Sequence, residues 1–446
     1  MHYIPNTDRD RAEMLKKIGA ADFAQLISCI PQSALLKDDL RLPPRLSELD
    51  LATLLKKMSD VNRSAGESIS FLGAGAYDHF IPSVVDHILQ RSEFYTAYTP
   101  YQAEVSQGTL QSIYEFQSLI CELTGMEVAN ASMYDGASAV AEAALMSHSH
   151  NRRREIVIPD SLHPAYKKVL KTYCSGLGLK ITVAPVENGS TELSYLEKNL
   201  SSDTSCVIIQ NPNFYGVVED VAKIEPLVHT TGALLVLVCD PVSLGILKSP
   251  GELGADLAVG EGQGMGNPLN FGGPFLGFFA AKKEMIRRMP GRIIAATTDA
   301  RGKRGFVMTL QTREQHIRRE KATSNICTNE ALCALAAAVH LSLLGKSGMA
   351  KVAQLCLQKS HYAMEQIAKI KGFSLKYQAP FFKEFVVSTP IPPQDIINGL
   401  VGKNILAGTD LSGTNPQLKD CLLVCVTEKR TKEQIDYFVN EIKNLI

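Results

Sequence analysis

The sequence has no excess of charge of either sign and no long apolar run. Lys+Arg and Asp+Glu both number 46 in 446 residues, so no general field attracts nucleic acid or an anionic membrane. No apolar run reaches the roughly 20 residues that a membrane span needs, and the mixed-charge N-terminus lacks the apolar core of a signal peptide. We therefore expect neither nucleic acid nor a membrane as a partner.

A cysteine framework is also missing, although the chain has ten cysteines. They are scattered, and some lie inside apolar runs, as Cys206 and Cys239 do. This distribution is typical of reduced, buried thiols in a cytoplasmic protein. The length predicts two or three packed units, because single cores stop growing beyond roughly 250–300 residues.

Several common catalytic motifs are absent. The chain has no GxxxxGK[ST] loop and no GxSxG elbow, and GAGAYD at 73–78 lacks the third glycine of a dinucleotide fingerprint. His148 and His150 precede three arginines at the end of a predicted helix, which favours a solvated helix terminus over a metal site. We expect no metal.

Three regions differ in their patterns. Residues 1–70 predict a helical N-terminal arm. Residues 71–329 alternate short apolar runs with helical stretches, which indicates a large α/β domain whose parallel sheet is covered on both faces. Residues 330–446 begin with long helical segments and end in short strands, so we expect a smaller α+β domain. The runs predicted as strands of the large sheet are 155–159, 180–185, 205–212, 233–241, 256–260 and 274–280.

Asp240 stands out at the end of the most apolar of these runs, LLVLVCD. Ligand-contacting residues of an open α/β sheet lie at this edge, but a carboxylate that caps a helix or satisfies a loop fits the pattern equally well. A carboxylate in this place could also stabilise a protonated pyridine nitrogen, as in pyridoxal phosphate sites.

The segment 94-FYTAYTPYQAEVSQG-108 combines aromatic and hydroxyl groups with few aliphatic ones. It is too polar for a core element and suits an interface or a small polar ligand site. A tyrosine-rich surface loop is the alternative. The candidate residues of this segment are Tyr95, Tyr98, Tyr101, Gln102 and Glu104.

Long motifs in the chain carry a resemblance to a known family. They are FYTAYTPYQAEVSQGTLQSIYEFQSLICELTGMEVANASMYDGASAVAEA, GEGQGMGNPLNFGGPFLGFFA, REKATSNICTNEAL and LLVCVTEKRTKEQID, and they run from about residue 71 to 441. With them the chain resembles the first subunit of two-subunit glycine decarboxylase, the P protein of the glycine cleavage system. The resemblance implies the fold of the fold-type-I pyridoxal phosphate enzymes, which is aspartate aminotransferase-like.

The resemblance also implies a function and partners. In that family, α and β subunits form an α2β2 assembly, which decarboxylates glycine and passes the aminomethyl group to the lipoyl arm of the H protein. The resemblance further implies that the 94–108 segment of this chain approaches the active site of the partner subunit. A second, weaker set of candidates lies in the polar turn before residue 329: Ser324, Asn325 and Thr328.

One departure from the family pattern matters for the cofactor. No lysine occurs between Lys248 and Lys282, and the place of the Schiff-base lysine falls near Gln263 or Gly264. Neither can form an imine, because an imine needs a primary amine. Nearby, 134-YDGASAV-140 predicts a helix N-terminus that could bind a phosphate, although the charge of Asp135 would oppose an anion there.

We therefore expect pyridoxal phosphate to be held by a lysine-bearing β subunit and not by this chain, in which Asp240 marks a vestigial pyridine position. Two alternatives stay open. The chain could be a self-sufficient pyridoxal phosphate enzyme, such as an aminotransferase or desulfurase, that uses Lys248 or Lys282. It could also be a non-catalytic scaffold.

Overall fold

The computed structural model describes residues 5–38, 40–62, 64, 66–270 and 272–446. The remaining positions, which belong to the predicted N-terminal arm and to the glycine-rich stretch at 259–279, lie outside the described residues. The chain divides into two compact units, residues 1–63 and 64–446, and each is described by itself. The predicted boundary at residue 330 inside the larger unit stays a prediction.

The smaller unit is helical. It contains α1 (Asp8–Ile18), α2 (Phe23–Leu26) and α3 (Glu48–Ser59), and none of their residues is buried. Ser47 caps α3 by accepting a hydrogen bond from the backbone N–H of Asp50 at 3.1 Å, as serine commonly does at a helix N-terminus.

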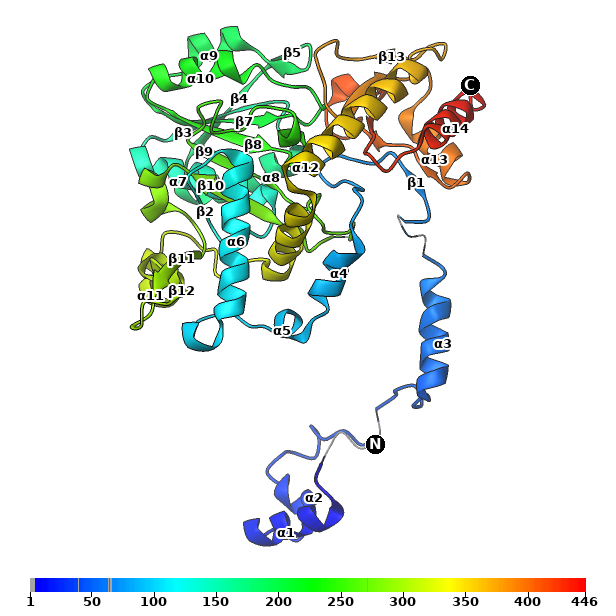
Figure 1. The fold of residues 1–446 in the computed structure, drawn as a ribbon. Helices are drawn as coiled ribbons and strands as arrows, with labels where there is room; N and C mark the ends of the chain where they lie inside the picture. The colour runs from blue at the N-terminus through cyan, green and yellow to red at the C-terminus, as the bar shows by residue number, and fades with distance from the viewer. Residues whose placement is uncertain (1–4, 39, 63, 65, 271) are drawn as a thin grey trace. The chain divides into compact units, whose positions relative to one another are not determined.

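A seven-stranded sheet forms the centre of the larger unit (Figure 1). Six strands run in one direction, and only β10 runs against its neighbours β9 and β2. The chain returns from β9 to β10 without a crossover helix, which an antiparallel pair permits and a parallel pair does not. In spatial order the strands are β2 (Val128–Ala129), β10 (Gly277–Ala281), β9 (Leu257–Glu261), β8 (Leu234–Cys239), β7 (Thr204–Asn211), β3 (Glu155–Pro159) and β4 (Lys180–Ala184).

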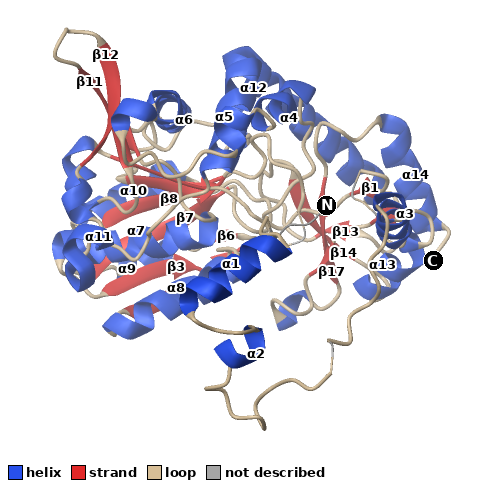
Figure 2. Cartoon of the chain, turned by 90° about the horizontal axis from the view of Figure 1, so that it is seen from below, coloured by secondary structure: helices blue, strands red, loops and turns tan. Residues whose placement is uncertain are grey.

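Helices cover both faces of this sheet, as Figure 2 shows for the red strands between blue helices. Val236 and Val238 pack in one core with α7 and α8, whereas Leu235 and Leu237 pack in another with α9 and α10. This alternation explains why the strand sequences are continuously apolar. The helices are α6 (Gln107–Thr124), α7 (Gly136–Asn151), α8 (Pro164–Leu177), α9 (Leu193–Asn199) and α10 (Val221–Thr230).

Helix α12 (Ala331–Ile367) connects the part of the larger unit that is built on the seven-stranded sheet with the part that is built on a second, four-stranded sheet. Its first part lies beside α6 (Figure 1), and its later residues Ala363 and Ile367 are buried in the core of a second sheet. A non-helical glycine, Gly345, bends it. By length and composition α12 could cross a membrane, but 44% of its most apolar window is buried inside the protein, and a core helix passes the same test.

The second sheet is antiparallel and has four strands. Its core contains Phe71 and Phe438, whose rings stack at 4.0 Å. Cys421 and Cys425 are both buried on β17 and belong to the core. The elements are β13 (Ser374–Leu375), β14 (Glu384–Ser388), β17 (Cys421–Cys425) and β16 (Thr409–Asp410), with helices α13 (Pro393–Val401) and α14 (Lys432–Lys443).

The sequence did not predict a hairpin of β11 (Ile293–Thr298) and β12 (Arg304–Thr309), which projects from the body of the larger unit in Figure 2. Its outer half is exposed and polar, so it carries no apolar run. Further short elements are β1 (Ile69–Ser70), which pairs with β15 (Ile405–Leu406), the pair β5 (Val186–Glu187) and β6 (Ser190–Thr191), and the helices α4 (Ser83–Leu89), α5 (Ser92–Tyr95) and α11 (Gln315–Arg318).

Candidate functional site

The carboxyl edge of the large sheet gathers charged side chains. Asp240 directly follows β8, Glu261 ends β9, and the N-terminus of α7 lies beside them. In open α/β sheets, ligands bind at this edge. Here the side chains leave a cavity of only about 30 Å³, far smaller than the roughly 300–1,000 Å³ of ligand pockets.

Lys383 occupies the place next to Asp240. Its Nζ lies 2.7 Å from Asp240 Oδ2, 3.0 Å from His79 Nε2 and 3.4 Å from the centre of the Tyr77 ring. The lysine side chain is 2% exposed. Burial alone would lower its pKa, but the carboxylate of Asp240 outweighs this effect, and the pKa of Lys383 is raised. A charged amine therefore neutralises the carboxylate that a pyridinium would need.

Glu261 blocks the N-terminus of α7. Its Oε2 accepts a hydrogen bond from Gly136 N–H at 2.9 Å, and Oε1 accepts from Gln263 N–H and Leu276 N–H, each at 2.9 Å. Burial raises the pKa of Glu261 to about 7. The protein's own carboxyl group thus takes the place where a helix N-terminus would bind a phosphate.

Asp135, which the sequence placed against a bound anion, instead caps α7. Its Oδ1 accepts a hydrogen bond from Ser138 N–H at 2.7 Å, and Ser138 Oγ accepts in return from Asp135 N–H at 3.2 Å. This reciprocal pair is a capping box. It leaves fewer free N–H groups for a phosphate.

Pyridoxal phosphate does not fit this edge of the chain. Gln263 has no amine and is itself engaged, since its side chain accepts from Tyr77 N–H at 2.8 Å and donates to Tyr77 O and Asn267 O. Its neighbour Gly264 is buried and has no side chain. The phosphate position, the pyridine partner and the available volume are all taken by the protein's own groups.

The two lysines of the self-sufficient alternative lie elsewhere. Lys248 is an exposed loop residue. Lys282 Nζ is 2.5 Å from Asp256 Oδ1, just before β9 begins, so it lies at the opposite end of that strand from Glu261. Neither amine reaches Asp240's edge of the sheet.

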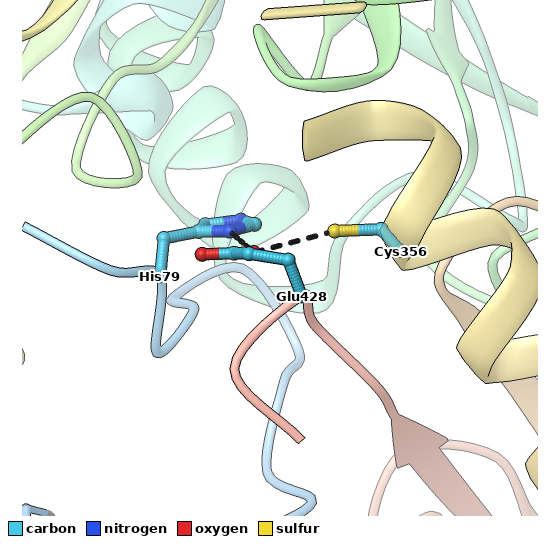
Figure 3. A group of neighbouring side chains, drawn as sticks. All are labelled: His79, Cys356 and Glu428. Carbon is cyan, nitrogen blue, oxygen red and sulfur yellow. Dashed lines mark hydrogen bonds and ion pairs between the residues drawn. The ribbon is translucent and has the colours of Figure 1, made fainter. Parts of the chain in front are cut away.

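His79, Glu428 and Cys356 form a hydrogen-bonded cluster (Figure 3), and His79 also contacts Lys383. Because Lys383 only donates, His79 Nε2 accepts from it, and Nδ1–H donates to Glu428 Oε2 at 2.6 Å. The Cys356 thiol lies 3.4 Å from the same oxygen. These are also zinc-ligand types, but ligands of one tetrahedral zinc stand about 3.3 Å apart, so 2.6 Å fits a shared proton better.

A second cavity, of about 220 Å³, brings together part of the predicted tyrosine segment. Tyr95 at the end of α5 and Tyr98 in the following loop line it together with Thr328. Tyr98 is 85% exposed. The cavity therefore has an accessible edge that is lined by hydroxyl-bearing side chains.

The other predicted residues lie around or outside this cavity. Tyr101 does not line it, but its hydroxyl is 3.4 Å from Arg292, which does. Gln102 and Glu104 are exposed and outside the cavity lining, as is Asn325, whose Oδ1 accepts from Gln315. Ser324 is also outside the lining, and its Oγ accepts from Ile326 N–H.

Sequence reasoning missed the basic residue of this cavity, Arg292. It directly precedes β11 and is 6% exposed. One arginine before an unpredicted strand gives no local signal, so only its neighbours in space identify it. Lys383 and Glu261 were missed for the same reason.

A comparison with solved structures identifies the fold. Glutamate decarboxylase from Lactobacillus brevis superimposes with a TM-score of 0.70 at 12% identity, covering 93% of this chain and 95% of that one. The architecture is that of the fold-type-I pyridoxal phosphate enzymes, so the predicted fold class is confirmed.

The family follows from closer matches. The model of the glycine cleavage system P-protein family matches residues 1–442, and the chain belongs to this family. A protein of Desulfitobacterium hafniense named probable glycine dehydrogenase (decarboxylating) subunit 1 is 54% identical over 98% of both chains. A crystal structure of glycine decarboxylase (P-protein) in inhibitor-bound form matches all of both chains with a TM-score of 0.92 at 39% identity. The resemblance drawn from the motifs is thereby confirmed.

Proposed function

We propose that this chain is subunit 1 of a two-subunit glycine dehydrogenase (decarboxylating) and that it acts without a cofactor of its own. The family and the names of its relatives support the activity. The single observation that carries the division of labour is the filled sheet edge, where Lys383 pairs with Asp240 in place of a pyridinium and Glu261 occupies the position of the phosphate.

The second subunit then holds pyridoxal phosphate on its own lysine. We propose an α2β2 assembly in the cytoplasm that acts on glycine and delivers the aminomethyl group to a lipoylated H protein. The relatives' name, subunit 1, supports a second subunit. The lysine, the tetramer, the H protein and the compartment are parts of the proposal.

This chain's contribution would come from the tyrosine segment. Tyr95 and Tyr98 are largely exposed at the rim of the 220 Å³ cavity, so their hydroxyl groups are free to meet a partner's site. Phenolic hydroxyls can orient a carboxylate, and the rings can exclude water. Tyr101, Gln102 and Glu104 belong to the same segment and are proposed to approach that site with it, and Thr328 lines the same cavity.

The experiment is reconstitution of glycine-dependent CO2 exchange with a lysine-bearing second subunit. We expect exchange only when both subunits are present. Tyr95→Phe or Tyr98→Phe should lower the rate about tenfold, the effect of one hydrogen bond of roughly 1.4 kcal/mol, without separating the subunits. Tyr437→Phe on α14 is the control for a partly exposed tyrosine outside this segment.

Exchange by this chain alone would overturn the division of labour. If Tyr95→Phe and Tyr98→Phe both keep the full rate in an intact complex, the assignment of the tyrosine segment is wrong.

A further inference from the structure

We propose that the 220 Å³ cavity is an oxyanion subsite and that Arg292 is the residue that binds the anion, a carboxylate or a phosphate. The inference rests on the proposed function for the anion's source, but its geometry stands by itself. Of the cavity's lining residues, Arg292 is the charged one, and no acidic side chain is among them.

The guanidinium of Arg292 is buried with most of its hydrogen-bonding capacity poorly used. One contact is short, from Nη2 to Cys327 O at 2.8 Å. The other three are long: 3.4 Å to the Tyr101 hydroxyl, 3.4 Å to Asn329 Oδ1 and 3.5 Å to Thr328 Oγ1. Nε has no hydrogen-bond partner among the described residues. A buried charge is normally paired and fully hydrogen-bonded. The Arg292 guanidinium therefore has donors available for a further acceptor.

The nearest carboxylate does not supply that partner. Glu314 Oε2 lies 4.0 Å from Arg292 Nε, at the limit of an ion pair, and 3.7 Å from His316 Nδ1. Within the part of the chain that the structure describes, the other oxygen of Glu314 has no hydrogen-bond partner either. This carboxylate therefore offsets the positive charge from a distance without saturating the guanidinium fork.

The cavity's chemistry selects a small oxyanion. A guanidinium offers five donors in a planar fork that matches carboxylate and phosphate oxygens. The hydroxyl groups of Tyr95, Tyr98 and Thr328 add donors on the same cavity. Its volume accommodates a group of this size, and the exposed tyrosine rim leaves it accessible from outside.

Two sources can present such a group in the proposed assembly. One is the carboxylate of glycine, and the other is the phosphate of the cofactor on the partner subunit. Both would bind through the same fork. They are distinguished by using glycine and inorganic phosphate as separate probes.

The test is calorimetric titration of the purified full-length chain with each probe. We expect saturable binding of at least one probe, and Arg292→Gln should weaken it at least tenfold. Arg304→Gln, an exposed arginine on the neighbouring strand β12, removes the same charge outside the cavity and should bind like the unmodified chain. Arg292→Lys keeps the charge without the fork, so it should show an intermediate loss and serves if the glutamine variant does not fold.

Binding of glycine alone would identify a carboxylate as the ligand of the subsite, and binding of phosphate alone would identify a phosphate as its ligand. Absence of saturable binding of both probes, or unchanged binding in Arg292→Gln or in Arg292→Lys, would overturn the subsite. The proposed function is tested separately by reconstitution with the unmodified chain, so a failure of one is not confused with a failure of the other.

Discussion

Asp240 and Lys383 form a buried ion pair at the sheet edge where an open cofactor pocket would need a free carboxylate. The pair is 2.7 Å long, and the lysine is almost fully buried. Removing one partner of such a pair leaves an uncompensated buried charge, which costs roughly 3–5 kcal/mol. Removing both leaves no charge to compensate.

Lys383→Met should therefore lower the free energy of unfolding by about 3–5 kcal/mol, and Asp240→Asn with Lys383→Met should recover most of that loss. Chemical denaturation of the purified chain measures both. Lys223→Met removes an exposed ion pair with Asp220 and should change stability by less than about 1 kcal/mol. If Lys383→Met is as mild as Lys223→Met, the lysine does not hold a buried charge.

Glu428 gives the structure a predictable response to acid. Burial opposes ionisation of its carboxyl group, but hydrogen bonds from His79 and from Phe80 N–H outweigh burial and lower its pKa to about 2. Because the folded pKa lies below the ordinary value of about 4.5, the stabilisation is complete above pH 4.5 and is lost as the pH falls through 2.

Glu428→Gln should accordingly reduce stability at pH 7, by up to about 3 kcal/mol, and the difference from the unmodified chain should shrink as the pH falls toward 2. Denaturation midpoints at pH 7 and pH 3 measure it. Glu365→Gln, an exposed acid on α12, should show no such trend. A constant difference at both pH values would contradict the pKa assignment.

At the scale of elements, the bend in α12 depends on one residue. Gly345 has φ 57° and ψ −174° inside the helix, a region that only glycine adopts without strain. The bend lets one helix serve both parts of the larger unit. A Cβ added at this position would meet no atom of the described residues within 4 Å, so the cost of a side chain would be conformational and not steric.

Gly345→Ala should thus destabilise the protein by about 1–3 kcal/mol, as seen in thermal or chemical unfolding. Gly402→Ala is the matched control, because Gly402 has φ −63° and equally open surroundings, and it should change stability little. Equal effects of the two substitutions would show that the bend does not need glycine.

At the scale of the whole molecule, local patterns predicted the fold and part of the site. The apolar runs ending at Pro159 and Asp240 are strands because each is buried on both faces, a signal contained in the run itself. The reversed direction of β10 depends on how the chain returns from β9, and the apolar pattern of a strand does not indicate its direction in the sheet. The tyrosine segment was found because its composition is unusual.

The residues that fill the sheet edge could not be found in this way. Lys383 directly precedes β14 of the second sheet and meets Asp240, which follows β8 of the large sheet, only through tertiary packing. Arg292 becomes a candidate only through Tyr101, Asn329 and the cavity beside them. Such contacts depend on tertiary packing, which sequence spacing does not reveal.

The central claim is that this chain belongs to a pyridoxal phosphate enzyme but cannot hold the cofactor itself. The direct measurement is to incubate the purified chain with pyridoxal phosphate, reduce with borohydride and locate any adduct by mass spectrometry. We predict no imine absorbance and no reduced adduct on this chain, and an adduct on a lysine of the second subunit when the two are combined. A specific, stoichiometric adduct on any lysine of this chain, Lys383 included, would contradict the account.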